Sequence, residues 1–211
     1  MKTNLKKRFS RRAIENSGFS TLELVIIMAV MLIVTAVGLP SFFRSLRTYQ
    51  LNDAATRVAS VIKFTRYQAI RLNVTLAAGV KAGGNNGCPG ASNWCLWTDS
   101  NANTSLDANT SLAGAENQTQ LLGNLTLVAA PGGLAGAVGA GALTDATAAG
   151  FVAFDRRGAV APAAVDVLCV QNTAFPDLGF RAVVLLPSGS VEIWTRDGST
   201  TGATGIWRQV N

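Results

Sequence analysis

The sequence predicts an α+β fold in which one long N-terminal helix packs on an antiparallel β-sheet. Two observations lead to this prediction. A helical pattern, first apolar and then amphipathic, covers residues 19–73, and short β-like runs separated by turn residues cover residues 74–211. The distribution of charge along the chain then divides it into segments with different expected roles.

Residues 1–18 form a basic leader segment. They contain six of the 18 basic residues but only one of the 12 acidic residues, so without them the net charge falls from +6 to +1. The basic pI therefore does not indicate a nucleic-acid partner. Basic residues in front of an apolar segment follow the positive-inside rule, which predicts a cytoplasmic N-terminus and a head outside the cytoplasm.

Residues 19–40 are predicted to be a membrane-spanning helix, because the run from Phe19 to Leu39 carries only one charge, Glu23. A secretory signal peptide has a shorter apolar region with small residues after it, whereas here Ser17 and Gly18 precede the run. An uncleaved anchor remains the alternative, although it explains neither Gly18 nor Glu23. A carboxylate in hydrocarbon is costly, and in a bundle of parallel helices its available cationic partner is the terminal amine of a neighbour.

Residues 41–73 are predicted to continue as an amphipathic stem helix, after a kink at Gly38 and Pro40. Apolar and small residues recur at spacings of three and four, which predicts a narrow face packed closely on a sheet of the same chain. They are Leu51, Ala55, Val58, Ile62, Thr65, Ala69 and Leu72. The stem carries a net charge of +5, expected on a solvated face near anionic lipid heads or acidic neighbours.

Residues 74–211 are predicted to form a β-rich head with a net charge of −3 from Lys81 onward. The expected strands are Val74–Val80, Trp94–Thr98, Leu121–Ala129, Phe151–Phe154, Val165–Val170, Phe180–Leu186 and Val191–Thr195. Turn residues at 155–158 and 187–190 predict tight connections, the second of which joins the last two strands in a hairpin. Residues 129–149 are nearly all Ala, Gly, Leu and Thr, which predicts a flexible insertion with little core.

The N-terminal pattern resembles the class III leader and helix of type IV pilins and type II secretion pseudopilins. The resemblance rests on Gly18-Phe19-Ser20-Thr21-Leu22-Glu23-Leu24 and on Gly38-Leu39-Pro40-Ser41-Phe42. It implies that a prepilin peptidase cuts between Gly18 and Phe19 and methylates the new amino terminus, and that Glu23 matches the family's invariant glutamate. It further implies other pilin or pseudopilin subunits and an inner-membrane assembly platform as partners, with membrane lipid around the helix before assembly.

Later phrases resemble the GspH/FimT group of minor pseudopilins. They are the stem phrases at 54–60 and 65–73, the tryptophan-bearing strand at 94–99, the turn at 151–158 and the hairpin at 187–191. One departure concerns nucleic acid, because DNA-binding members carry arginines after the hairpin glycine, where this chain has Ser190-Val191-Glu192. A glutamate repels phosphate, so we expect no DNA uptake by direct binding, and Arg156 and Arg157 are the remaining candidates for such contact.

Three cysteines allow one disulfide and one free thiol in the oxidising periplasm. Cys88 and Cys95 are close in sequence and are the favoured pair, whereas Cys169 lies in an apolar strand and is expected to be a buried small hydrophobe.

One loop spaces oxygen-bearing side chains like a calcium loop, at Asp99, Asn101, Asn103 and Asp107, with Glu116 as a distant candidate. It lacks the glycine and the final glutamate of an EF-hand, so an Asx-rich surface loop is the favoured interpretation over a weak calcium site.

The sequence does not predict an enzyme. The chain has no histidine, which excludes histidine-dependent triads and histidine-ligated metals, and we expect no cofactor. Three functions are left. The favoured one is a minor pseudopilin of a type II secretion system, and the alternatives are a minor type IV pilin in pilus assembly or DNA uptake and an uncleaved single-pass periplasmic binding protein. For the favoured function we expect a single-pass protein of the inner membrane with a cytoplasmic N-terminus, assembled in a periplasmic or surface filament.

Overall fold

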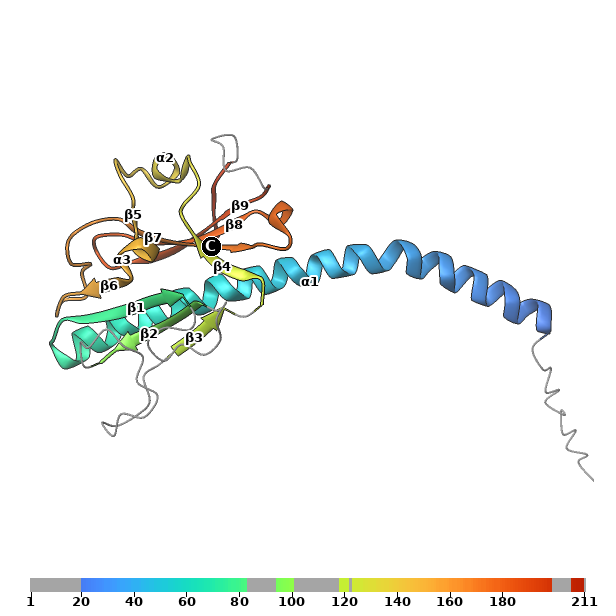
Figure 1. Ribbon diagram of the computed structural model, residues 1–211, viewed down its shortest axis with the longest axis horizontal. Helices are drawn as coiled ribbons and strands as arrows, with labels where there is room; N and C mark the ends of the chain where they lie inside the picture. The colour runs from blue at the N-terminus through green and yellow to red at the C-terminus, as the bar shows by residue number, and fades with distance from the viewer. Residues whose placement is uncertain (1–19, 83–93, 101–117, 122, 199–205, 211) are drawn as a thin grey trace, which may run out of the picture. The chain divides into compact units, whose positions relative to one another are not determined.

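The computed structural model describes residues 20–82, 94–100, 118–121, 123–198 and 206–210. The chain divides into two units, residues 1–44 and residues 45–211. Helix α1 (Thr21–Leu72), 52 residues long, contributes to both (Figure 1). The fold is α+β, as the sequence predicts, and the predicted membrane and stem helices are one helix that contains Pro40.

Two sheets make up most of the second unit. The first sheet has the order β3-β2-β1-β6, and all its pairs are antiparallel. Its strands are β1 (Leu76–Ala82), β2 (Trp94–Asp99), β3 (Gln118–Leu121) and β6 (Phe151–Phe154). The second sheet has the order β10-β9-β8-β7-β4, and β5 pairs in parallel with β7 at its side. Its strands are β4 (Leu125–Val128), β5 (Thr144–Asp145), β7 (Asp166–Asn172), β8 (Phe180–Leu185), β9 (Val191–Arg196) and β10 (Arg208–Val210).

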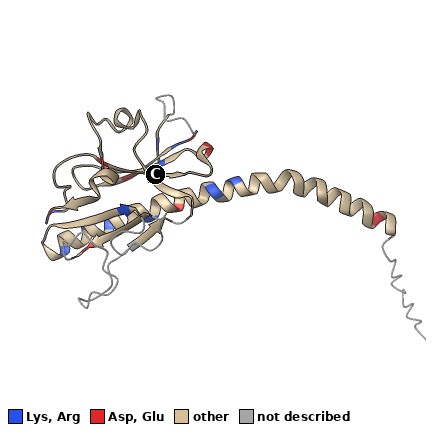
Figure 2. Ribbon diagram, in the orientation of Figure 1, with Lys and Arg blue, Asp and Glu red and all other residues tan. Residues whose placement is uncertain are grey.

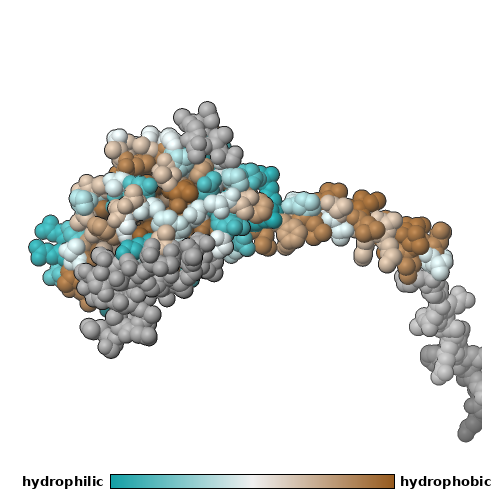
Figure 3. Space-filling view, viewed as in Figure 1, coloured by the Kyte–Doolittle hydropathy of each residue, from teal (hydrophilic) through white to brown (hydrophobic). Residues whose placement is uncertain are grey.

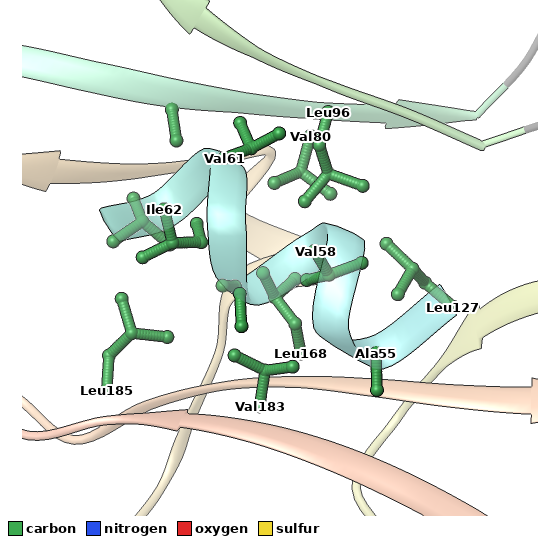
Figure 4. Close-up of a cluster of buried hydrophobic side chains, with 14 of the residues drawn as sticks. Ala55, Val58, Val61, Ile62, Val80, Leu96, Leu127, Leu168, Val183 and Leu185 are labelled. Carbon is green, nitrogen blue, oxygen red and sulfur yellow. The ribbon is translucent and has the colours of Figure 1, made fainter. Parts of the chain in front are cut away.

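The stem part of α1 lies between these two sheets, so the prediction of packing on a single sheet is wrong. Val80 and Leu96 of the first sheet lie on one side of the helix in Figure 4. Leu168, Val183 and Leu185 of the second sheet lie on the other side, and all belong to one buried cluster. A helix enclosed from two sides needs a wide apolar surface, which the narrow predicted stripe did not provide.

The buried surface of the stem is indeed wider than predicted. Six of the seven predicted residues are buried, and Leu72, the last residue of α1, is 51% exposed. Ala54, Ala59 and Val61 are buried in addition. Burying an aliphatic side chain of the size of Ile62 contributes about 1.5–3 kcal/mol, so these contacts are the main source of stability for the helix in this unit.

The predicted strand Leu121–Ala129 divides into two strands that belong to different sheets. β3 ends at Leu121 in the first sheet, and β4 begins at Leu125 in the second. Gly123 between them has φ +69°, a left-handed conformation that glycine adopts without steric cost. The hydrophobic pattern could not reveal this change of sheet, because both strands turn apolar residues toward the same helix.

The predicted hairpin is present, since β8 and β9 pair in antiparallel register from Phe180↔Arg196 to Leu185↔Val191. Residues 129–149 contain two short helices, α2 (Leu134–Val138) and α3 (Ala146–Ala149). Elsewhere in the chain, a 3₁₀ helix, η1 (Pro176–Leu178), precedes β8. Leu134 is fully buried and Ala146 is 1% exposed, so the prediction of little core in this insertion is wrong at these residues. The flexibility of the insertion stays a prediction.

Candidate functional site

The first half of α1 is an apolar rod whose side chains are all exposed. None of its most apolar stretch is buried. Figure 3 shows the apolar surface along this segment. Within the described residues, α1 is the one helix long and apolar enough to cross a membrane. A helix that is apolar on every side is stable in lipid or against other apolar surfaces, which fits a single-pass membrane segment.

Glu23 lies in the first turn of α1 and is exposed. Figure 2 shows this acidic position near the start of the helix, followed by a long uncharged stretch. Ser20 stands directly before the helix, and its carbonyl oxygen accepts from the backbone N–H of Leu24 at 3.1 Å. Ser-x-x-Glu at a helix start is the capping-box pattern, in which the glutamate satisfies a free backbone donor.

The spacing of Ser20 and Glu23 allows a capping box, a local role for Glu23 that was not predicted although the spacing is visible in the sequence. A carboxylate in the first turn is also favourable toward the helix dipole. Both effects act within one chain and are distinct from pairing with another chain.

The predicted processing site, Gly18 and Phe19, lies outside the described residues. Gly38 and Pro40 both lie inside α1, and space is open around Gly38. A proline in a helix removes one backbone donor, so the carbonyl of Ala36 lacks its usual partner. The helix continues through this point, and the kink stays a prediction.

Arg66 is one of the basic residues of the stem that the structure places differently from expectation. We predicted a solvated position, but its Nε donates to the carbonyl oxygen of Gly158 at 2.9 Å and its Nη2 donates to that of Ser188 at 3.2 Å. These carbonyls belong to the two predicted turns. One guanidinium group therefore ties the stem to both turns, and no pattern in the sequence indicates this contact.

Arg181 of β8 is a buried cation between the second sheet and α1. Its Nε donates to the side-chain oxygen of Asn52, and its Nη1 donates to the carbonyl oxygen of Phe180 at 2.9 Å. Burial lowers the pKa of Arg181, and the carboxylate of Asp197, 3.7 Å away, acts in the opposite direction. These bonds compensate for the loss of solvation and identify Arg181 as a structural residue.

The predicted disulfide lies partly outside the described residues. Cys95 is disulfide-bonded, and Cys169 is a free buried thiol, as expected. Burial, with a smaller contribution from Asp145, raises the pKa of Cys169 to about 12, which makes it unreactive. Cys88 is not among the described residues, so its pairing with Cys95 stays a prediction.

Of the candidate ligands in the predicted calcium loop, the structure describes only the first. Asp99 ends β2 and is 2% exposed, whereas Asn101, Asn103, Asp107 and Glu116 lie outside the described residues. In the described parts of the chain, no three Asp, Glu, Cys or His side chains are grouped as metal ligands. The calcium interpretation stays a prediction.

The residues that bear on DNA contact lie on one turn and one strand. Arg156 and Arg157 are exposed on the turn between β6 and Val160. Glu192 accepts a hydrogen bond from Trp194 Nε1 at 3.0 Å, which holds its carboxylate on β9.

No family model, curated protein or solved structure matches this chain.

Proposed function

We propose that this chain is a filament subunit of the pilin and pseudopilin type, with a pilin-like fold, and that it acts as a minor pseudopilin in type II secretion. The observation that carries this proposal is the division of α1. Its first half is apolar, exposed and carries one carboxylate, whereas its second half is buried between two sheets.

This division suits a subunit that moves from a membrane into a filament. The first half of α1 is solvated by lipid in the membrane, and in a filament the same surface packs against the helices of other subunits. The head keeps its fold in both states, because the stem is anchored in the buried cluster between the sheets. The basic leader and the small residues before Phe19 support removal of residues 1–18 by a prepilin peptidase.

Glu23 is the residue that would set the position of one subunit along its neighbour. Its carboxylate is close to the start of the processed chain, and the methylated amine of Phe19 in an adjacent subunit is the available cation. Pairing the two offsets the cost of a charge in an apolar environment.

A charge-specific substitution tests this role. Glu23→Gln keeps the capping-box pattern, which accepts glutamate or glutamine, but removes the charge, whereas Glu23→Asp keeps the charge. We expect both variants to be cleaved and to remain in the inner membrane. Co-purification with the partner subunits is expected to fall strongly for Glu23→Gln and less for Glu23→Asp, and normal assembly of Glu23→Gln would contradict the charge-pairing proposal.

The secretion function is favoured over DNA uptake by Glu192. It occupies the hairpin segment where phosphate-binding arginines would be expected, and it is held there by Trp194. The identity of the neighbouring genes separates the two systems: a secretin, a secretion ATPase and other pseudopilins are expected, and a retraction ATPase with pilus genes would favour a type IV pilus.

A further inference from the structure

A cleft of about 440 Å³ lies where the stem of α1 meets the start of β4 and the end of β7. Arg47, Gln50 and Arg57 line it from the helix. Gln120, Asn172 and Phe175 line it from the two sheets and the residues before η1. All of these residues belong to the unit of residues 45–211.

Arg47 is held in the cleft by an aromatic ring. Its guanidinium carbon lies 3.4 Å from the centroid of the Phe175 ring, so the cation is stacked on the ring face. Stacking fixes the plane of the guanidinium and leaves its N–H groups to donate within that plane. Among the described residues, no carboxylate lies within ion-pair distance of Arg47.

The cleft is positive overall. Its one carboxylate, Asp53, forms an ion pair with Arg57 at 2.8 Å, so the charge of Arg47 is the one left uncompensated within the cleft. The Asn172 side-chain oxygen accepts from the backbone N–H groups of Ala174 and Phe175, which leaves its amide nitrogen as a donor. The cleft therefore presents one stacked cation, Arg47, and the carboxamide groups of Asn172, Gln50 and Gln120 to a ligand.

The cleft is also near the end of the apolar segment in the chain. Arg47 directly follows Leu46, which is 43% exposed, and Phe42 and Phe43 continue the apolar sequence beyond Pro40. The polar headgroup layer of a bilayer begins where the hydrocarbon ends and adds roughly 5–8 Å on each side. A long basic side chain next to the end of an apolar segment extends toward this layer, where the lipid phosphates are found.

We propose that this cleft binds the phosphoglycerol headgroup of an anionic phospholipid, and this inference rests on the proposed insertion of α1 in the membrane. Arg47 donates two N–H groups to two oxygens of the phosphate, a bidentate and charge-assisted contact. Gln50, Gln120 and Asn172 bond the glycerol hydroxyls. A choline headgroup fits less well, because its fixed positive charge faces Arg47 and it has no hydroxyl for the carboxamides.

Lipid binding by the full-length chain in mild detergent micelles tests the proposal. The probes are short-chain phosphatidylglycerol and phosphatidylcholine, counted on the protein by native mass spectrometry. We expect one phosphatidylglycerol per chain, bound in preference to phosphatidylcholine. Arg47→Gln is expected to weaken this binding by about tenfold, the scale of one hydrogen bond to a charged group.

Arg44→Gln is the matched control, since it removes the same charge three residues earlier, outside the cleft. We expect it to change binding less than about twofold. Phe175→Leu keeps the charge but removes the ring under Arg47, and we expect binding to weaken in the same direction as for Arg47→Gln. Equal losses for Arg44→Gln and Arg47→Gln would show a general attraction to anionic lipid and would overturn the proposal.

Two further measurements identify the source of the ligand and separate this inference from the proposed function. Soluble glycerol 3-phosphate is expected to compete only weakly, and binding as tight as that of the lipid would overturn the lipid assignment. Flotation with liposomes tests membrane insertion separately. A chain that floats with phosphatidylcholine vesicles and shows no preference for phosphatidylglycerol would refute the cleft and leave the proposed function intact.

Discussion

Arg66 on α1 donates its Nε–H to the carbonyl oxygen of Gly158, 92 residues later in the chain. Its second bond, to the carbonyl oxygen of Ser188, brings a third segment to the same guanidinium. The stem helix, the turn after β6 and the turn between β8 and β9 therefore meet at one side chain. This junction fixes both sheets to the helix at the end of the stem.

Replacing Arg66 with methionine is expected to destabilise the head by about 1.5–3 kcal/mol, because the hydrogen bonds from a charged donor are lost. Lys63→Met is the control, since Lys63 is exposed on the same helix and is expected to change stability by less than about 0.5 kcal/mol. Unfolding of the full chain in detergent micelles, followed by tryptophan fluorescence, measures both. Equal effects of the two variants would show that Arg66 acts only as a surface charge.

Gly189 is predicted to be intolerant of any side chain. Its φ of +79° is strained for other residues, and a Cβ would lie 1.9 Å from the carbonyl oxygen of Gly158 and 2.7 Å from Arg66 Nε. Gly139 has φ +74° with open space around it. Gly139→Ala is expected to cost about 1–2 kcal/mol for the left-handed backbone alone, and Gly189→Ala considerably more because of the collision. Similar melting temperatures for both variants would contradict the close approach of the two turns.

Thr65 of the stem and Thr98 of β2 form a buried hydroxyl pair with an O–O distance of 2.8 Å. Thr65 also donates to the carbonyl oxygen of Val61, so Thr98 is the donor within the pair. Thr65→Val leaves a buried hydroxyl without its acceptor and is expected to cost about 1–3 kcal/mol. The double variant Thr65→Val/Thr98→Val is expected to be more stable than the sum of the single effects predicts. A double-mutant cycle with strictly additive effects would show that the pair is not coupled.

Asp166 is predicted to reduce stability at neutral pH. It is 9% exposed at the start of β7, and burial raises the pKa of its carboxyl group above the ordinary value. A raised pKa means that the folded state binds the proton more tightly, so stability is lost as the pH rises through the carboxyl pKa range. Asp166→Asn is therefore expected to raise the unfolding temperature at pH 7, with a smaller gain in acid. A gain of equal size at every pH would contradict this assignment.

The sequence predicted most of the fold because its hydrophobic periods are clear. The stem stripe and the hairpin of β8 and β9 are confirmed, since each depends on local spacing. Placement of α1 between two sheets was not predicted, because the division at Gly123 has no hydrophobic signature. Leu134 was missed for a related reason: a single leucine in a segment rich in alanine and glycine does not indicate a buried position.

Some residues of the candidate site could be predicted from the sequence and others could not. Glu23 and the apolar half of α1 could be identified, because a lone charge in a membrane-length run is visible in the composition. The roles of Arg47 and Arg66 could not, because their partners, Phe175 and the turns at Gly158 and Ser188, are more than 90 residues away. Only the folded chain brings such pairs together.

The intact mass of the chain purified from the inner membrane of its own cells tests the central claim most directly. The account predicts a protein that begins at Phe19 and carries one added methyl group on its amine. A chain that still starts at Met1, in cells with an active prepilin peptidase, would contradict it.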